Sequence, residues 1–155
     1  MYIALMAFLI GIVCGLRALL GLAVLSWAAR LHKIELEGSP LAFMGYRFTP
    51  WIVSLASIGE LVNDKLPKTP SRLIPPQFIT RVVMGALCGA VVGVTAHALL
   101  LGLITGVLGS VAGTLGGAKA RGFLAHAFKA DLPAALLEDV IAIGLALLVV
   151  FSIGS

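Results

Sequence analysis

Residues 82–118 read VVMGALCGAVVGVTAHALLLGLITGVLGSVAGTLGGA, a run of 37 residues without Lys, Arg, Asp or Glu. One helix crosses the hydrocarbon core of a bilayer with about 20 apolar residues. The run is therefore too long for one crossing, and it is long enough for two crossings joined by a tight turn. This stretch decides the fold class, because water-soluble proteins rarely contain such a segment.

The composition of the whole chain agrees with a membrane protein. Of its 155 residues, 60% are hydrophobic and only 12% are charged, and the mean hydropathy is +1.10. An average soluble domain is roughly half apolar and about a quarter charged. The formal net charge of +4 is better explained by basic cytoplasmic loops than by nucleic-acid binding, so no nucleic-acid partner is expected.

Five segments are predicted to span the membrane in an all-α, polytopic transmembrane helical bundle with short loops. They cover residues 3–31, 50–66, 79–96, 98–118 and 133–153, within one integral membrane domain over residues 1–155. The first segment is too long for a signal peptide and lacks its basic start. Four prolines between residues 67 and 77 exclude a regular helix there. The expected surroundings of the helices are the lipid bilayer.

The distribution of Lys and Arg predicts the orientation. Five crossings place the termini on opposite faces, and the N-terminal side then has seven basic residues against three on the other side. Because positively charged loops stay in the cytoplasm, we expect the N-terminus in the cytoplasm and the C-terminus outside. The seven are Lys65, Lys68, Arg72, Arg81, Lys119, Arg121 and Lys129, and the three are Arg30, Lys33 and Arg47.

Glycines recur at intervals of about four residues in three of the segments. This spacing lets helix backbones approach closely, and in lipid such packing replaces hydrophobic association. We expect packing faces within the subunit or between subunits, and a flexible gate is the alternative. The glycines in the pattern are Gly11, Gly15, Gly85, Gly89, Gly93, Gly102, Gly106, Gly109, Gly113 and Gly117.

Arg17 is the most informative single residue, because uncharged and mostly apolar residues flank it from Ile3 to Ala29. At 1.5 Å per residue it is expected near the bilayer midplane. A central Arg costs about 2.5–3.5 kcal/mol to insert, so the folded protein should supply a partner. The alternative is a break at Gly15 or Gly21 that leaves two half-helices around the charge.

Two polar groups are candidate partners for this arginine. Glu60, Asn63 and Asp64 share one face of the second segment, and Glu138 and Asp139 lie near the start of the fifth. An ionisable residue within the membrane is a functional-site hypothesis by default, so these five residues and the arginine form the predicted ligand or ion pathway. The alternatives are a purely structural ion pair for the arginine and interface positions for the acids, which fit Asp64 and Asp139 best.

Signatures of soluble enzymes and of metal sites are absent from the sequence. It contains no P-loop, no G-x-S-x-G, no H-E-x-x-H, and no His or Cys pair at metal-ligand spacing. Cys14 and Cys88 lie in apolar segments, where buried free cysteines are expected rather than a disulfide framework. No catalytic residue, metal or cofactor is predicted, and an enzymatic role is left open.

Five stretches of the chain carry a family resemblance: GLRA at 15–18, SWAAR at 26–30, GELVNDKLPKTPSR at 59–72, GALCGA at 85–90 and DLPAALLEDVIAIG at 131–144. Together they resemble a bacterial family of small integral membrane proteins, domain of unknown function 4126. The resemblance covers nearly the whole chain and implies a protein of the bacterial inner membrane, but it implies no activity. Many members have Ala where this chain has Asn63, which adds polarity to the acidic face.

Three functions fit these features. The first is a small transporter or channel in which Arg17 balances charge or binds an anion, while Glu60 and Glu138 carry protons or cations. It is expected to be a homo-oligomer, because five short helices enclose little space. The second is a non-catalytic accessory or assembly protein that meets partner helices through its glycine faces. The third is an intramembrane enzyme or a lipid-binding protein that uses the same carboxylates.

Overall fold

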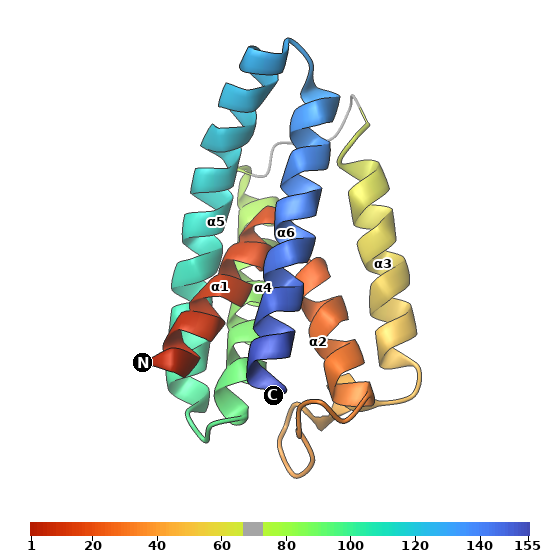
Figure 1. Ribbon diagram of the computed structural model, residues 1–155, viewed down its shortest axis with the longest axis vertical. Coiled ribbons are helices and arrows are strands. Elements are labelled where there is room, and N and C mark those ends of the chain that lie inside the picture. Colours follow the sequence, from red (N-terminus) through yellow and green to blue (C-terminus); the bar gives the residue numbers. More distant parts are fainter. Residues whose placement is uncertain (67–72) are drawn as a thin grey trace.

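The computed structural model describes residues 1–66 and 73–155, which form α-helices and one short 3-10 turn, with no strand among them (Figure 1). The helices are α1 (Tyr2–Leu16), α2 (Leu20–Arg30), α3 (Thr49–Asn63), α4 (Pro75–Val94), α5 (Leu99–Phe128) and α6 (Asp131–Ile153), and the 3-10 turn is η1 (Ala42–Gly45). The predicted all-α fold is confirmed.

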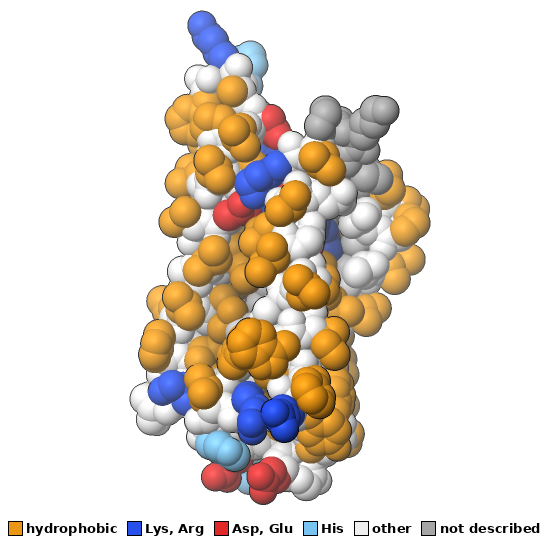
Figure 2. Space-filling model, turned by 90° about the vertical axis from the view of Figure 1, so that its right-hand side faces the viewer, with side chains coloured by type: hydrophobic (Ala, Val, Ile, Leu, Met, Phe, Trp, Pro, Cys, Tyr) orange, Lys and Arg blue, Asp and Glu red, His pale blue; other side chains and the backbone are white. Residues whose placement is uncertain are grey.

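Among the described residues, three helices are long and apolar enough to cross a membrane: α4 with 20 residues, α5 with 30 and α6 with 23. The helices α1 and α3 have 15 residues each, and α2 has 11. Hydrophobic side chains cover the middle of the molecule in Figure 2, while charged side chains gather toward its two ends. An outer surface of this kind suits contact with lipid acyl chains.

The first predicted segment is broken into a helical hairpin. Helix α1 ends at Leu16, Arg17 has an extended backbone (φ −140°, ψ 107°), and α2 begins at Leu20 and runs back in the opposite direction (Figure 1). The break falls between Gly15 and Gly21, the two glycines named above as possible places for a break. We call residues 17–19 the hairpin tip, and this tip lies inside the protein.

Contacts at the two ends of this hairpin show that it enters and leaves on one side. The Tyr2 hydroxyl donates a hydrogen bond to the Ser152 carbonyl oxygen at 2.6 Å, and the Lys33 ammonium lies 5.6 Å from the centre of the Phe151 ring. We call the end that holds these residues the terminal end, and the end with the α5–α6 turn at Lys129 the far end. The prediction of termini on opposite faces was wrong, because a segment counted as a crossing returns to the side from which it came.

Glycines hold α5 in backbone contact with α4 and with α1. A Cβ atom on Gly89 would lie 2.2 Å from the carbonyl oxygen of Gly102, and one on Gly11 would lie 2.3 Å from that of Gly106. Such distances leave no room for a side chain and allow the close backbone packing typical of membrane helices. Gly117 is only half-buried and borders a shallow apolar groove. The close approach recurs at Gly15, Gly85, Gly93, Gly109 and Gly113.

Two helix boundaries differ from the prediction. Pro75 and Pro76 form the first turn of α4 instead of a loop, because a proline lacks only an N–H group that has no helical partner there. Helix α5 continues past the predicted end at Ala118 as far as Phe128, where Lys129 ends it in a left-handed conformation with φ 54°. Its 30 residues extend about 45 Å, which exceeds a hydrocarbon core of about 30 Å.

Candidate functional site

The charged residues of the membrane segments meet at the hairpin tip. Helix α6 brings Asp139 to the tip, and this residue lies 14 positions before the helix end at Ile153, or about 21 Å along the axis. The tip is therefore nearer the far end of the molecule than its terminal end, and the midplane position of Arg17 stays a prediction. The last turn of α3 reaches the same level, and α4 and α5 each contribute an arginine.

Arg17 is fully buried and pairs with two aspartates. Its Nη1 donates to Asp64 at the end of α3. Its Nε donates to Asp139 Oδ1 at 2.6 Å, and its Nη2 lies 2.5 Å from the same oxygen. Lys65 Nζ lies 2.5 Å from the other carboxylate oxygen of Asp139. Because an uncompensated charge in a membrane interior is costly, these pairs join the tip firmly to α3 and α6.

Glu60 closes the N-terminal end of α2. Its two carboxylate oxygens accept hydrogen bonds from the backbone N–H groups of Ala18 and Leu19 at 2.8 and 2.9 Å. The first N–H groups of a helix have no partner within it, and the helix dipole favours negative charge there. In lipid, such groups must be satisfied inside the protein. Glu60, from α3, meets that requirement.

Arg81 closes the C-terminal end of α1 in the complementary way. Its Nη1 donates to the carbonyl oxygens of Gly15 and Leu16 at 2.9 and 2.8 Å, and its Nη2 lies 3.7 Å from Glu60 Oε1. Carbonyl groups at the end of a helix attract cations, as its first N–H groups attract anions. Each half-helix end is thus capped by a side chain of opposite charge from another helix.

Arg121 on α5 extends this charged cluster toward the far end. Its guanidinium pairs with Asp64, and it lies 2.7 Å from Asp131 and 3.7 Å from Glu138. Glu138 is buried and also borders the apolar groove of about 260 Å³ formed by α1, α5 and α6. It therefore faces a different opening from Glu60.

A cavity of about 320 Å³ lies between α3 and α4 beside the hairpin tip. Its wall combines carboxylate, guanidinium and carboxamide groups with small apolar side chains. Ligand pockets in proteins have volumes of about 300–1,000 Å³, so the cavity can hold a small polar molecule next to charged groups. The lining residues are Leu19, Ala56, Gly59, Glu60, Asn63, Asp64, Gln77 and Arg81.

The structure divides the predicted pathway residues into three sets. Glu60, Asn63 and Asp64 line the cavity, Glu138 borders the apolar groove, and Arg17 and Asp139 lie together in closely packed ion pairs. From the sequence, Asp64 and Asp139 are the acids expected to fit interface positions best. In the structure these two aspartates are the partners of Arg17. A part in transport stays a prediction for every member of the set.

Sequence reasoning missed three basic residues of the cluster. The pattern assigns Lys65, Arg81 and Arg121 to cytoplasmic loops, because each lies at the edge of an apolar segment. A signal existed for Arg81: prolines at 75 and 76 suit a first helical turn, and a helix that starts there contains Arg81 in its second turn. No comparable local signal marks Arg121, whose partners come from α3 and α6.

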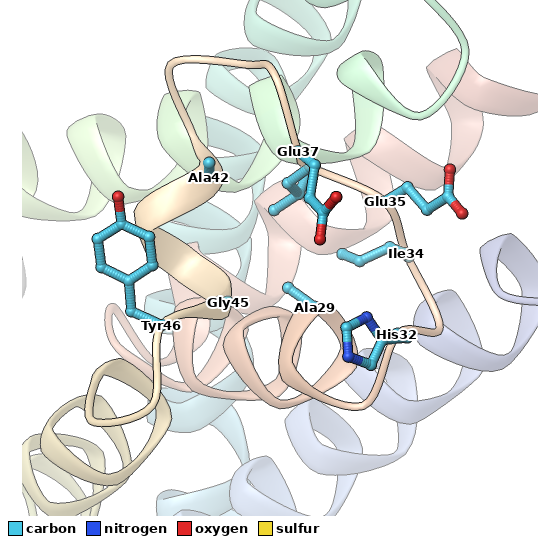
Figure 3. Close-up of a pocket in the computed structure, with 9 residues that line it drawn as sticks. Ala29, His32, Ile34, Glu35, Glu37, Ala42, Gly45 and Tyr46 are labelled. Carbon is cyan, nitrogen blue, oxygen red and sulfur yellow. The ribbon is translucent and has the colours of Figure 1, made fainter.

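A separate cavity of about 290 Å³ lies at the terminal end, between α2 and the loop that follows it (Figure 3). Glu37 lies between His32 and Tyr46 in this view, and all three side chains are exposed. The cavity shares no lining residue with the one at the hairpin tip. Within residues 1–66 and 73–155, no group of three or more His, Cys, Asp or Glu side chains is placed to hold a metal ion.

Residues 4–152 match the family described as Domain of unknown function (DUF4126). The match covers nearly all of the chain and confirms the resemblance carried by the motifs around Arg17, Glu60 and Glu138. No curated protein and no solved structure matches the chain. Because the family description names no activity, the function has to be argued from the geometry.

Proposed function

On the premise that the chain belongs to the DUF4126 family, we propose that it is a small transporter or channel of the bacterial inner membrane. The broken helix carries this proposal: α1 and α2 meet at Arg17, and Glu60 and Arg81 cap their ends while lining a cavity. Discontinuous helices recur at the binding sites of transporters. Non-helical backbone at membrane depth occurs where it is buried in protein or lines a water-filled cavity.

Two parts of the charged cluster have different roles in this proposal. Arg17 has no exposed surface and is held by Asp64 and Asp139, so it positions the tip. Glu60 and Arg81 line the cavity. A carboxylate can take up and release a proton, whereas a guanidinium stays charged. Glu60 is therefore the residue proposed to change its charge during transport.

Flux measurements in proteoliposomes test the proposal. We expect Glu60→Gln to abolish the flux while the protein keeps its size-exclusion profile, because the substitution preserves shape and removes the charge. Glu35→Gln is the matched control, since Glu35 is an exposed carboxylate at the terminal end, and it should keep wild-type flux. The proposal is overturned if wild-type protein gives no more flux than empty liposomes for protons, alkali cations, halides and small organic acids.

We further propose that the far end faces the cytoplasm. Among the described residues other than Arg17, five basic residues lie toward the far end and three lie at the terminal end: Lys65, Arg81, Lys119, Arg121 and Lys129 against Arg30, Lys33 and Arg47. Lys68 and Arg72 lie outside the described residues. Positively charged segments stay in the cytoplasm, so both termini lie outside. A C-terminal alkaline phosphatase fusion should then be active and a C-terminal green fluorescent protein fusion dark. The opposite pattern overturns this orientation.

A non-catalytic accessory protein is the second candidate, and the outer face of α3 favours it. The side chains of Trp51, Ile52, Leu55, Ile58 and Val62 are 58–73% exposed along this helix, which packs mainly against α2 and η1. Such a face suits lipid, a partner helix or a second copy in a homo-oligomer. Native mass spectrometry in mild detergent separates the candidates, because an accessory protein should remain in a larger complex and should tolerate Glu60→Gln.

A further inference from the structure

We propose that the cavity beside the hairpin tip binds a small monovalent anion, a carboxylate or a halide, in exchange with the carboxylate of Glu60. The inference names a substrate class for the proposed function and rests on it for the link to transport. Binding itself can be measured without any transport.

The cavity contains a buried cation that already faces a carboxylate. Arg81 is 3% exposed, lines the cavity, and places Nη2 3.7 Å from Glu60 Oε1. A guanidinium group matches a carboxylate in geometry and charge. The backbone N–H groups of Ala18 and Leu19 donate to the same carboxylate. These donors belong to the hairpin and to α4, whereas the acceptor is the end of one flexible side chain from α3.

The cavity has room for Glu60 to move and for an anion to take its place. Its volume of about 320 Å³ is roughly ten times the 30 Å³ that a water molecule occupies in the liquid. Ala56 and Gly59 line it on the same helix as Glu60, and a Cβ atom added to Gly59 would meet no atom within 4 Å. Formate and chloride are small enough to reach the donors once the carboxylate turns into this space.

Charge balance links the exchange to a proton. Arg81 from α4 faces Glu60 at 3.7 Å. The other charges of the cluster pair among themselves: Arg17 with Asp64 and Asp139, Lys65 with Asp139, and Arg121 with Asp64, Asp131 and Glu138. A proton on Glu60 removes one negative charge and one strong acceptor, and a bound anion restores both. Each exchange therefore takes up one proton with one anion, and a transport cycle built on it is an electroneutral symport.

Thermal unfolding of the purified full-length protein in detergent tests this inference, with sodium formate, sodium chloride and neutral formamide as the probes. We expect both salts to have little effect on the melting temperature of the wild-type protein, because the Glu60 carboxylate occupies the donors. In Glu60→Ala, which lacks the competing carboxylate, the same salts should raise it by on the order of 3 °C at saturation. Formamide should have no effect.

Glu138→Ala is the matched control, because Glu138 is the other glutamate of the cluster and borders a different opening. It should respond to the salts no more than the wild-type protein does. If Glu60→Ala does not fold, Glu60→Gln, which also lacks the competing charge, provides the same test. A response to formate alone assigns a carboxylate site, and a response to chloride alone assigns a halide site.

Equal salt effects in the wild-type protein and in all variants overturn the inference. Flux in proteoliposomes without anion binding also overturns it and leaves the proposed transporter in place. Anion binding without flux supports the anion site and overturns the transporter. The two proposals therefore fail separately.

Discussion

The protein contains two helical hairpins whose turns are built differently. The α4–α5 hairpin turns at the terminal end, and there the chain satisfies its own polar groups. The N–H groups of Ala96 and Ala98 donate to the Gly93 carbonyl oxygen at 3.1 and 2.9 Å, and the Thr95 hydroxyl donates to that of Val92 at 2.7 Å. Each of these donors lies within five residues of its acceptor.

The α1–α2 hairpin turns inside the protein, and there the partners are distant in sequence. Glu60 lies 42 residues from Ala18, and Arg81 lies 66 residues from Gly15. Water can help to satisfy a turn at the membrane edge, but a turn at membrane depth needs partners from the protein. The comparison teaches that a local turn can be encoded by a few neighbouring residues, whereas an interior turn depends on charges supplied by other helices.

The largest expected effect comes from removing the cation at the interior turn. Arg17→Met leaves the half-buried Asp64 and the buried Asp139 without the partner they share, and breaking a buried ion pair in this way costs about 3–5 kcal/mol. We expect little monodisperse protein in detergent and a melting temperature lower by roughly 6–20 °C. Arg47→Met, at an exposed position in the terminal-end loop, is the control. Equal stability of the two variants would show that the interior turn does not need its charge.

The next largest effect is expected at the C-terminal cap of α1. Arg81→Met removes the donors to the Gly15 and Leu16 carbonyl oxygens and the cation nearest Glu60, so the free energy of unfolding should fall by about 2–4 kcal/mol. Arg81→Lys should recover part of this loss, because an ammonium restores the charge but not the planar geometry. The melting temperatures of the three proteins measure both effects. No recovery in Arg81→Lys would mean that geometry alone matters.

An intermediate effect is expected where the α4–α5 hairpin packs most closely. Gly89→Ala places a methyl group 2.2 Å from the Gly102 carbonyl oxygen, which forces the helices apart and should cost about 1–3 kcal/mol. Gly144→Ala is the control on α6, because a Cβ atom there would meet nothing within 4 Å. It should be neutral or stabilise the helix by up to about 1 kcal/mol. Thermal unfolding that gives both variants the same shift would contradict close packing at Gly89.

The smallest effect is expected at the turn between α4 and α5, where neighbouring residues satisfy the polar groups. Thr95→Ala removes one hydrogen bond, from its hydroxyl to the Val92 carbonyl oxygen, and a neutral bond of this kind contributes about 0.5–1.5 kcal/mol. The melting temperature should therefore fall by a few degrees at most. A loss as large as that of Arg81→Met would remove the distinction between the two hairpins.

The apolar segments were predictable from the sequence, because apolar length and glycine spacing are local properties. Whether the first segment crosses the membrane or folds back could not be predicted. Residues 3–31 are long enough to cross a bilayer, and their hydropathy is the same whether the chain continues or folds back. Only Arg17, Gly15 and Gly21 marked the place of the break. The wrong orientation of the termini follows directly from this ambiguity.

The sequence predicted which acids belong to the candidate site better than it predicted which acid pairs with Arg17. A buried Arg17 requires acids, and the acids on two other helices were available by position along the chain. Depth along a helix does not determine which acid meets the arginine, because that depends on how the helices are placed side by side. Asp64 and Asp139 therefore contact Arg17, while Glu60 binds the backbone of the tip.

The pairing of Arg17 with Asp139 has a consequence for biosynthesis. The two residues are 122 positions apart, so at about 5–20 residues per second the ribosome needs roughly 6–24 s to add the second after the first. Asp64 at the end of α3 follows after 47 residues, but α6 and its Asp139 are missing during the whole of this interval. The first hairpin should therefore wait at a hydrated surface, or in contact with the insertion machinery, and take its final place only after the last helix is made.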